Sequence, residues 1–157
     1  DPVNINLGRR HITFEIGDVT LVSRLLEGDF LNYEASIPRD TKVNVIAETK
    51  PLHEAVERVS LIINERLKNP IRCFFEDGNL RLSCSTPLGR ANDEVKIEGN
   101  GGNIEIGFNN RYLQDAIRAV PDEKVSIQLI NGISPCIIRP IENDDYLFMV
   151  LPVRLKA

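Results

Sequence analysis

Histidine is scarce in this chain, and neither copy has the neighbours that metal or acid–base chemistry requires. The two are His11 and His53. His53-Glu54 resembles the start of a zinc-protease helix, but that motif needs a second histidine four residues on, where the chain has Glu57. Neither histidine stands at metal-ligand spacing from a cysteine or from the other histidine. The sequence therefore predicts no metal centre and no cofactor.

Cysteine is also rare, and long apolar runs are missing. Cys73, Cys84 and Cys136 are widely spaced in apolar or alternating segments, which is typical of reduced thiols in a cytosolic protein. No apolar run approaches the ~20 residues that span a bilayer. Residues 1–4 form neither a basic signal peptide nor a natural initiator. We expect a cytoplasmic protein in which this chain begins part-way along a longer polypeptide.

The chain also lacks a catalytic motif. Its glycine-rich segment, residues 99–102, has no following Lys-Ser/Thr and precedes an expected strand, so it is not a phosphate loop. The acidic pairs Asp122-Glu123 and Asp144-Asp145 fall in expected turns, where carboxylates are usually solvated. The 19 basic and 23 acidic residues give a net charge of −4, which argues against a protein coated with nucleic acid but permits a local basic face. We therefore expect a binding protein and not an enzyme.

Alternation of apolar and polar residues dominates the N-terminal part. It covers residues 3–7, 11–16 and 19–25, with turns at Gly8 and Gly17-Asp18, a period typical of β-strands. Such a meander is too small to bury a core alone. It is therefore expected to belong to a larger sheet.

A second unit, with helical as well as alternating periods, is expected from about Lys42. Thr49 is placed to cap a helix with Pro51 in its first turn, and Asn109 to cap a second helix. Turns at residues 77–79 and 99–102 predict two hairpins. The expected apolar helix faces are Leu52, Ala55, Val56, Val59, Ile62 and Ile63, and then Tyr112, Leu113, Ala116, Ile117 and Val120. The expected strands are 43–47, 71–76, 80–86, 94–98, 103–107, 124–130, 133–140 and 146–153. The predicted fold class is α+β, with two helices packed on an antiparallel sheet.

The two ends of the chain show an internal repeat. Val3-x-Ile-x-Leu7 matches Val125-x-Ile-x-Leu129, and Asp18-Val-Thr-Leu-Val22 resembles Asp145-Tyr-Leu-Phe-Met149. Self-similarity of this kind indicates that one α+β unit occurs more than once in the parent protein. We expect residues 1–42 to be the last strands of one copy and residues 43–157 to be the whole of the next.

Five stretches carry a resemblance to a known family. They are Leu26-Glu-Gly-Asp-Phe-Leu-Asn-Tyr33 with Ile37-Pro38, Ala55-Val-Glu-Arg-Val-Ser-Leu61, Ile104-Glu-Ile-Gly-Phe-Asn109, Arg111-Tyr-Leu-Gln-Asp-Ala116, and Tyr146-Leu-Phe-Met-Val-Leu-Pro-Val-Arg-Leu155. In this order and spacing the chain resembles the C-terminal part of the bacterial DNA sliding clamp, the beta subunit of the replicative DNA polymerase.

The resemblance implies a processivity factor for DNA replication. Such clamps are rings of two subunits, each with three copies of an α+β domain, with helices lining the hole and sheets outside. They hold duplex DNA non-specifically and dock short peptide motifs of DNA polymerase, clamp loader and repair proteins. By this resemblance residues 1–42 are the end of the middle domain and residues 43–157 are the third domain. The full-length protein is then a homodimer, and this fragment alone cannot close the ring.

The resemblance also implies a partner-binding cleft that includes the C-terminus. The matching positions are Leu31, Ala35, Ser36, Pro135, Met149, Val150, Leu151, Pro152, Val153, Arg154 and Leu155. Apolar residues continue there where a solvated tail would become polar, which favours a peptide groove, and Pro152 favours a strand end. A core strand remains an alternative for residues 146–148. Leu31, Glu34 and Ala35 differ from the basic or prolyl residues common in the family, so local specificity is expected to differ.

Two further surfaces follow from the resemblance. The DNA-facing positions are Arg58, Arg111, Gln114 and Arg118, and the subunit-interface positions are Leu61, Ile62, Asp93 and Glu94. A clamp needs weak phosphate contacts without base contacts. For the first set the alternative is an ordinary solvated helix face with pairs such as Glu54–Arg58. For Leu61 the alternative is a wider buried stripe.

Two other functions stay open at this point. One is a repeat-built α+β scaffold of another lineage, which would share the architecture but not the partners. The other is a small α+β enzyme, which would require a pocket with converging polar groups.

Overall fold

The computed structural model describes residues 2–64 and 69–155. The chain divides into two compact units, Asp1–Tyr33 and Glu34–Ala157. Residues 34–42, which the sequence pattern grouped with the N-terminal segment, fall in the second unit in this division. The alternating N-terminal segment thus forms a unit of its own.

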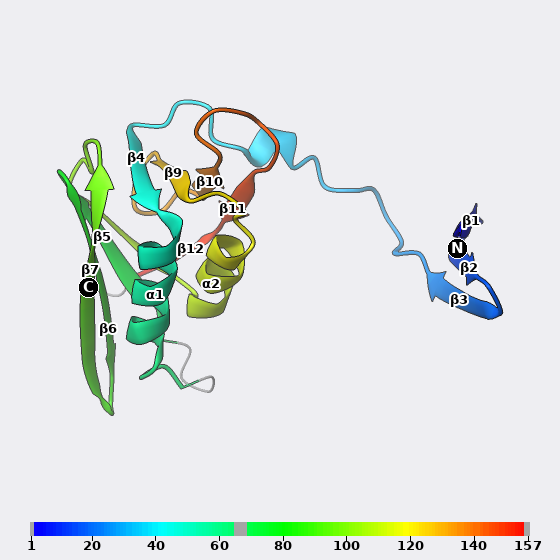
Figure 1. Ribbon diagram of the computed structural model, residues 1–157, viewed down its shortest axis with the longest axis horizontal. Coiled ribbons are helices and arrows are strands. Elements are labelled where there is room, and N and C mark those ends of the chain that lie inside the picture. The colour runs from blue at the N-terminus through cyan, green and yellow to red at the C-terminus, as the bar shows by residue number, and fades with distance from the viewer. Residues whose placement is uncertain (1, 65–68, 156–157) are drawn as a thin grey trace. The chain divides into compact units, whose positions relative to one another are not determined.

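The first unit is a small antiparallel sheet. Its strands in the described residues are β1 (Asn4–Leu7), β2 (His11–Ile16) and β3 (Val19–Arg24), paired in that order (Figure 1). This confirms the predicted meander. Ile5 lies opposite Phe14, and Phe14 opposite Leu21. Because side chains alternate between the faces of a strand, these residues make one face of the sheet apolar.

The second unit is built on a large, curled antiparallel sheet. In the described part of the chain its nine strands pair in the order β11-β10-β9-β4-β7-β6-β5-β8-β12. The 3-10 helix η1 (Glu34–Ser36) precedes them. The strands are β4 (Val43–Glu48), β5 (Ile71–Glu76), β6 (Asn79–Thr86), β7 (Gly89–Glu98), β8 (Ile104–Phe108), β9 (Lys124–Leu129), β10 (Cys136–Arg139), β11 (Phe148–Val150) and β12 (Pro152–Val153). Only Leu151 separates β11 from β12, which stand at opposite ends of this order, so the sheet curls until its ends meet.

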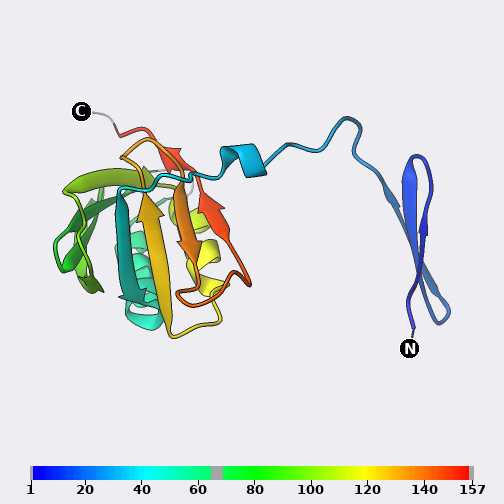
Figure 2. The same ribbon diagram turned by 90° about the horizontal axis from the view of Figure 1, so that it is seen from above.

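Helices α1 (Thr49–Ser60) and α2 (Asn110–Arg118) contact each other and cover the inner face of this sheet. Figure 2 shows β4, β9, β10 and β11 as one layer across both helices. Leu52, Ala55, Val56 and Val59 recur at helical spacing and are all buried. Burying a valine or leucine side chain contributes about 1.5–3 kcal/mol, so this stripe fixes α1 on the sheet.

The ends of the helices follow the sequence only in part. Asn109 caps α2 as predicted, because its Oδ1 accepts hydrogen bonds from the backbone N–H groups of Arg111 and Tyr112. The prediction for Thr49 was wrong: Glu48 occupies the cap position, and Thr49 is the first helical residue. The backbone N–H of Thr49 instead donates to the carbonyl oxygen of Glu123, 2.8 Å away. Tyr112 was wrongly assigned to the apolar face of α2, since its side chain is 63% exposed.

The predicted hairpin around residues 99–102 was also wrong. β7 pairs with β6 and β4, whereas β8 pairs with β5 and β12. The glycine-rich segment therefore crosses from one strand to a non-neighbour. Gly101 lies so close to the end of β5 that a Cβ there would be 2.4 Å from the carbonyl carbon of Phe75. This close packing requires glycine and explains the composition that resembled a turn.

Among the residues described, no helix has the length and apolar character that crossing a membrane requires.

Candidate functional site

The C-terminal segment, residues 149–155, forms an apolar surface at the edge of the large sheet. The expected single strand divides in two: β11 pairs with β10, while β12 pairs with β8 through Pro152–Phe108 and Val153–Gly107. Leu151 is 61% exposed and Val153 is 37% exposed. Val150 instead points into the core. In this segment Val150 therefore anchors the chain in the core, while Leu151 and Val153 present apolar surface to solvent.

The remaining residues of the segment differ in exposure. Met149, Pro152 and Leu155 are half-buried, and Arg154 is exposed. Of the preceding run, Tyr146 and Phe148 pack against the core with their ring centroids 5.2 Å apart. Of residues 146–148, only Phe148 therefore lies in a strand that packs on the core; Tyr146 packs on the core just before β11, and Leu147 is exposed.

A turn at residues 131–135 lies beside this segment. Asn131 Oδ1 accepts hydrogen bonds from the backbone N–H groups of Ile133 and Ser134, at 2.9 and 2.8 Å. The pairing of Cys136 with Val150 then brings half-buried Pro135 next to Leu151. Ile133 is exposed and was missed by the sequence argument. An apolar residue directly after an Asn-Gly turn was the available signal.

The other cleft positions lie before β4. Ala35 and Ser36 are exposed in η1 of the second unit. Leu31 is exposed in the first unit, next to an edge-to-face contact between Phe30 and Tyr33 whose ring centroids are 6.1 Å apart. These exposed apolar and small residues fit a contact role, but each is described only within its own unit.

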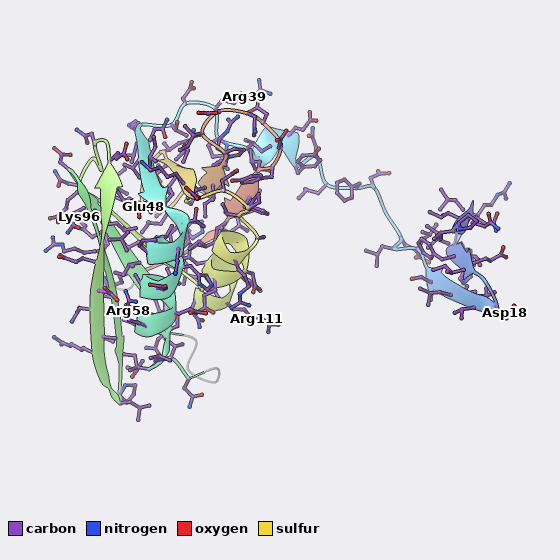
Figure 3. The ribbon with its side chains drawn as sticks, viewed as in Figure 1. Asp18, Arg39, Glu48, Arg58, Lys96 and Arg111 are labelled. Atoms are coloured by element: carbon purple, nitrogen blue, oxygen red, sulfur yellow. The ribbon has the colours of Figure 1, made fainter. Side chains whose placement is uncertain are left out.

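The positively charged helix positions all have carboxylate partners. Arg111 lies 4.0 Å from Asp115 on α2, and Arg118 reaches across to Glu57 of α1 at 3.7 Å. Gln114 is half-buried between them. Figure 3 labels Arg58 beside α1 and Arg111 beside α2. The helix face therefore carries alternating charge and not a continuous basic stripe.

Arg58 is bound more firmly than the other two arginines. Its Nε donates to Asp93 Oδ2 of β7 at 2.6 Å, and Glu54 lies 3.8 Å away. The hydrogen bond from Arg58 holds the pKa of the Asp93 carboxyl below its ordinary value and raises the pKa of Arg58. The structure thus joins a position expected to face DNA with one expected at the subunit interface.

The expected interface residues lie at the end of α1 and in the middle of β7, which begins at Gly89 and not, as expected, at residue 94. Leu61 directly follows α1 and is 83% exposed, so the alternative of a wider buried stripe does not hold for it. Ile62 packs partly against the core. Glu94 accepts a hydrogen bond from Asn79 at 3.2 Å. Within the described residues β4 pairs with β7 only at Ile97 and Glu98, so the first part of β7 is a sheet edge.

The described residues offer little to metal or thiol chemistry. They contain no group of three or more His, Cys, Asp or Glu side chains that could hold a metal ion. All three cysteines are free and buried, and burial raises the pKa of Cys136 to about 12 and that of Cys73 as well. A thiol that stays protonated is neither a nucleophile nor a metal ligand.

Comparison with known proteins identifies the family. Residues 34–154 match the family described as DNA polymerase III beta subunit, C-terminal domain. The beta sliding clamp of Pseudomonas aeruginosa is 36% identical over 154 residues, which are 98% of this chain and 42% of that protein. The crystal structure of the DNA polymerase III subunit beta from Pseudomonas aeruginosa superposes on this chain with a TM-score of 0.87. The structure of the sliding clamp from the same organism bound to griselimycin superposes with a TM-score of 0.84. Both are 36% identical, and the match covers 98% of this chain and 42% of theirs.

The chain spans about 42% of the length of these relatives. The matched family covers most of the second unit, including both helices and all strands from β4 to β12. On this match, the chain belongs to the family of the bacterial DNA polymerase III beta subunit, the beta sliding clamp.

Proposed function

We propose that this chain is the partner-docking part of a DNA sliding clamp that serves as a processivity factor in replication. The exposed apolar segment 149–155, fixed at the edge of the sheet by β12, is the observation that carries the proposal. The whole protein would tether DNA polymerase to its template, and its work is binding without catalysis. The griselimycin-bound Pseudomonas aeruginosa clamp supports the view that a clamp of this fold offers a ligand site.

The docking surface consists of two neighbouring apolar elements. Leu151 and Val153 come from the C-terminal segment, and Ile133 and Pro135 come from the adjacent turn. Apolar side chains that a rigid sheet holds in water bind the apolar anchors of a short peptide at low entropic cost. Short motifs of DNA polymerase, clamp loader and repair proteins are the proposed ligands. Ala35 and Ser36 of η1 are proposed as further contact positions of the second unit, and Leu31 as a contact position of the first unit.

The first unit is proposed to be the end of a preceding clamp domain. Its strands have the antiparallel order of β9, β10 and β11, and its apolar face requires a cover. In a longer clamp the preceding part of the polypeptide would supply that cover. Residues 43–157 would then hold the strands and helices of the C-terminal domain, and residues 34–42 belong to the same compact unit.

The helices are proposed to face duplex DNA in the assembled ring. Arg111 and Arg118 are exposed, but each has a carboxylate within 4.0 Å. Such neighbours weaken phosphate contacts, which suits a protein that must slide. Arg58 is the weakest candidate because Asp93 already occupies its guanidinium. Leu61, with Ile62 and the edge of β7 at Asp93 and Glu94, is proposed as the subunit contact of a homodimer.

A peptide titration tests the docking surface. A fluorescent peptide of the type Gln-Leu-x-Leu-Phe is expected to bind this chain, with NMR shifts at residues 149–155. The double substitution Leu151→Ala and Val153→Ala should lower the affinity for the peptide about tenfold or more. A few apolar side chains carry most of the binding energy of such sites, so truncating them has a large effect. Leu88→Ala is the control, because Leu88 is also an exposed apolar residue but lies between β6 and β7. Absence of binding, or equal loss in the control, would contradict the proposal.

A further inference from the structure

Strand β8 carries a glycine where the C-terminal segment crosses it. Gly107 pairs with Val153 of β12 on one side and with Arg72 of β5 on the other. It is buried, and its φ lies outside the left-handed region that favours glycine. The backbone there would accept an L-amino acid, so the reason for glycine must be space.

The C-terminal segment fills that space. A Cβ on Gly107 would lie 2.5 Å from Leu155 Cδ2, 3.0 Å from Leu155 Cγ and 2.8 Å from the carbonyl oxygen of Val153. Contacts this short are not tolerated by a real Cβ, and Val153 O belongs to the backbone, so the strand itself would have to move. Leu155 therefore rests directly on the backbone of β8.

The neighbouring turn uses the same strand in the same way. A Cβ on Gly132 would lie 2.2 Å from the carbonyl oxygen of Glu105, also in β8. The φ of Gly132 likewise lies outside the left-handed region. Gly132 directly precedes Ile133, so its close approach sets how the turn 131–135 lies against the sheet. Both elements of the docking surface are thus seated on β8 through glycine.

We propose that Gly107 is a positioning residue for peptide binding, and that Gly132 plays the same part for the adjacent turn. This inference rests on the proposed docking function. Neither glycine contacts the ligand. Because these glycines have no side chains, the C-terminal segment and the turn 131–135 can both pack closely on β8. This packing sets the spacing of Val153, Leu155 and Ile133 for an apolar peptide. A methyl group added at either glycine would shift the segment relative to the turn.

The substitution Gly107→Ala first tests, without ligand, whether Gly107 positions the C-terminal segment on β8. We expect the amide resonances of Val153, Arg154 and Leu155 to shift and their hydrogen exchange to quicken, while the amides of α1 keep their protection. Affinity for the Gln-Leu-x-Leu-Phe peptide should fall about tenfold. Gly132→Ala should shift residues 131–135 and lower affinity in the same direction.

Two controls separate positioning from general loss of stability. Val59→Ala removes buried atoms of α1 far from the segment in sequence, so it should lower the Tm without changing peptide affinity. In the Leu155→Ala background, Gly107→Ala should cost less affinity than in the wild type, because the side chain that it displaces is gone. Additive losses, or unchanged exchange at Val153–Leu155, would overturn the inference. If the wild-type chain fails to bind peptide, the docking function fails, while the exchange measurement still decides whether Gly107 seats the segment.

Discussion

Two meanders of this chain share order and pattern but differ in what surrounds them. β1, β2 and β3 pair in chain order, as do β9, β10 and β11 at one end of the large sheet. Ile127 and Ile138 of the second meander are 4% and 1% exposed and share a core with Leu113 of α2. Ile5 and Leu21 of the first are each 60% exposed.

This difference shows that an apolar sheet face and the burial of that face are separate properties, although an alternating sequence suggests both. Alternation determines that one face of a sheet is apolar, because side chains point to opposite sides in turn. Burial of that face depends on a cover from elsewhere, which α1 and α2 provide for β9, β10 and β11. The proposed function assigns the missing cover of the first unit to the preceding part of a longer clamp.

Placing a charge on each apolar face gives the largest expected contrast. Ile138→Asp would bury a carboxylate without a partner, costing about 5 kcal/mol or more, which approaches the whole ~5–15 kcal/mol stability of a domain. Leu21→Asp leaves its carboxylate in water and should change the free energy of unfolding of the second unit by less than about 0.5 kcal/mol. Thermal unfolding followed by circular dichroism measures both. Similar losses in the two variants would show that the first face is covered as well.

A smaller contrast comes from two of the three tyrosines, Tyr146 and Tyr33. Tyr146 Oη donates to Asp122 Oδ2 at 2.6 Å, linking the loop before β11 to the loop before β9, whereas Tyr33 lies in the exposed segment after β3. Tyr146→Phe should cost about 1 kcal/mol, and Tyr33→Phe nothing measurable. Urea denaturation of both variants at neutral pH measures the difference.

The pH dependence of the Tyr146 effect has a definite sign. Burial, and then the hydrogen bond to Asp122, raise the pKa of Tyr146 above its ordinary value. The protonated hydroxyl therefore stabilises the fold at all pH below the unfolded pKa of ~10, and this contribution is lost as pH rises through the folded value. The gap between wild type and Tyr146→Phe should narrow above pH ~10. A gap that widens there would contradict the assignment.

Sequence patterns predicted what is local in this fold. The alternation of β1, β2 and β3 and the cap of α2 at Asn109 depend on residues within a few positions of one another, and both were confirmed. The crossing between β7 and β8 was mistaken for a hairpin because glycines serve tight turns and close packing equally. The division of the C-terminal run at Leu151 depends on which strand each half meets, and that is a property of the whole sheet.

The candidate site shows the same limit. The family resemblance brought attention to residues 149–155, and the structure then showed which of them are exposed. The sequence pattern could not show that Gly107 closely approaches Val153 and Leu155, or that Gly132 closely approaches Glu105 of β8, since those contacts join positions far apart in the chain. The pair of Arg58 with Asp93 spans 35 positions and was missed for the same reason.

The smallest contrast compares two ion pairs, one in each unit. Arg58–Asp93 fastens the covering helix α1 to β7 at 2.6 Å, and the Asp93 side chain is only 20% exposed. Arg24–Glu27 has a similar separation of 3.1 Å, but both side chains are more than two-thirds exposed. Exposed pairs contribute little because water screens them. Asp93→Asn should therefore lower the Tm of the second unit slightly at neutral pH, and Glu27→Gln should not.

Acid titration makes that last comparison decisive. Because Arg58 holds the pKa of Asp93 below its ordinary value, the contribution of Asp93 is present above the unfolded carboxyl pKa of ~3.9 and is lost as pH falls through the lower folded value. The Tm difference between wild type and Asp93→Asn should be constant from neutral pH to about 5 and then close on further acidification. Glu27→Gln should follow the wild type throughout. A constant Asp93→Asn difference down to the lowest pH would mean that the carboxylate acts through packing alone, and that the tie between the cover and the sheet is apolar.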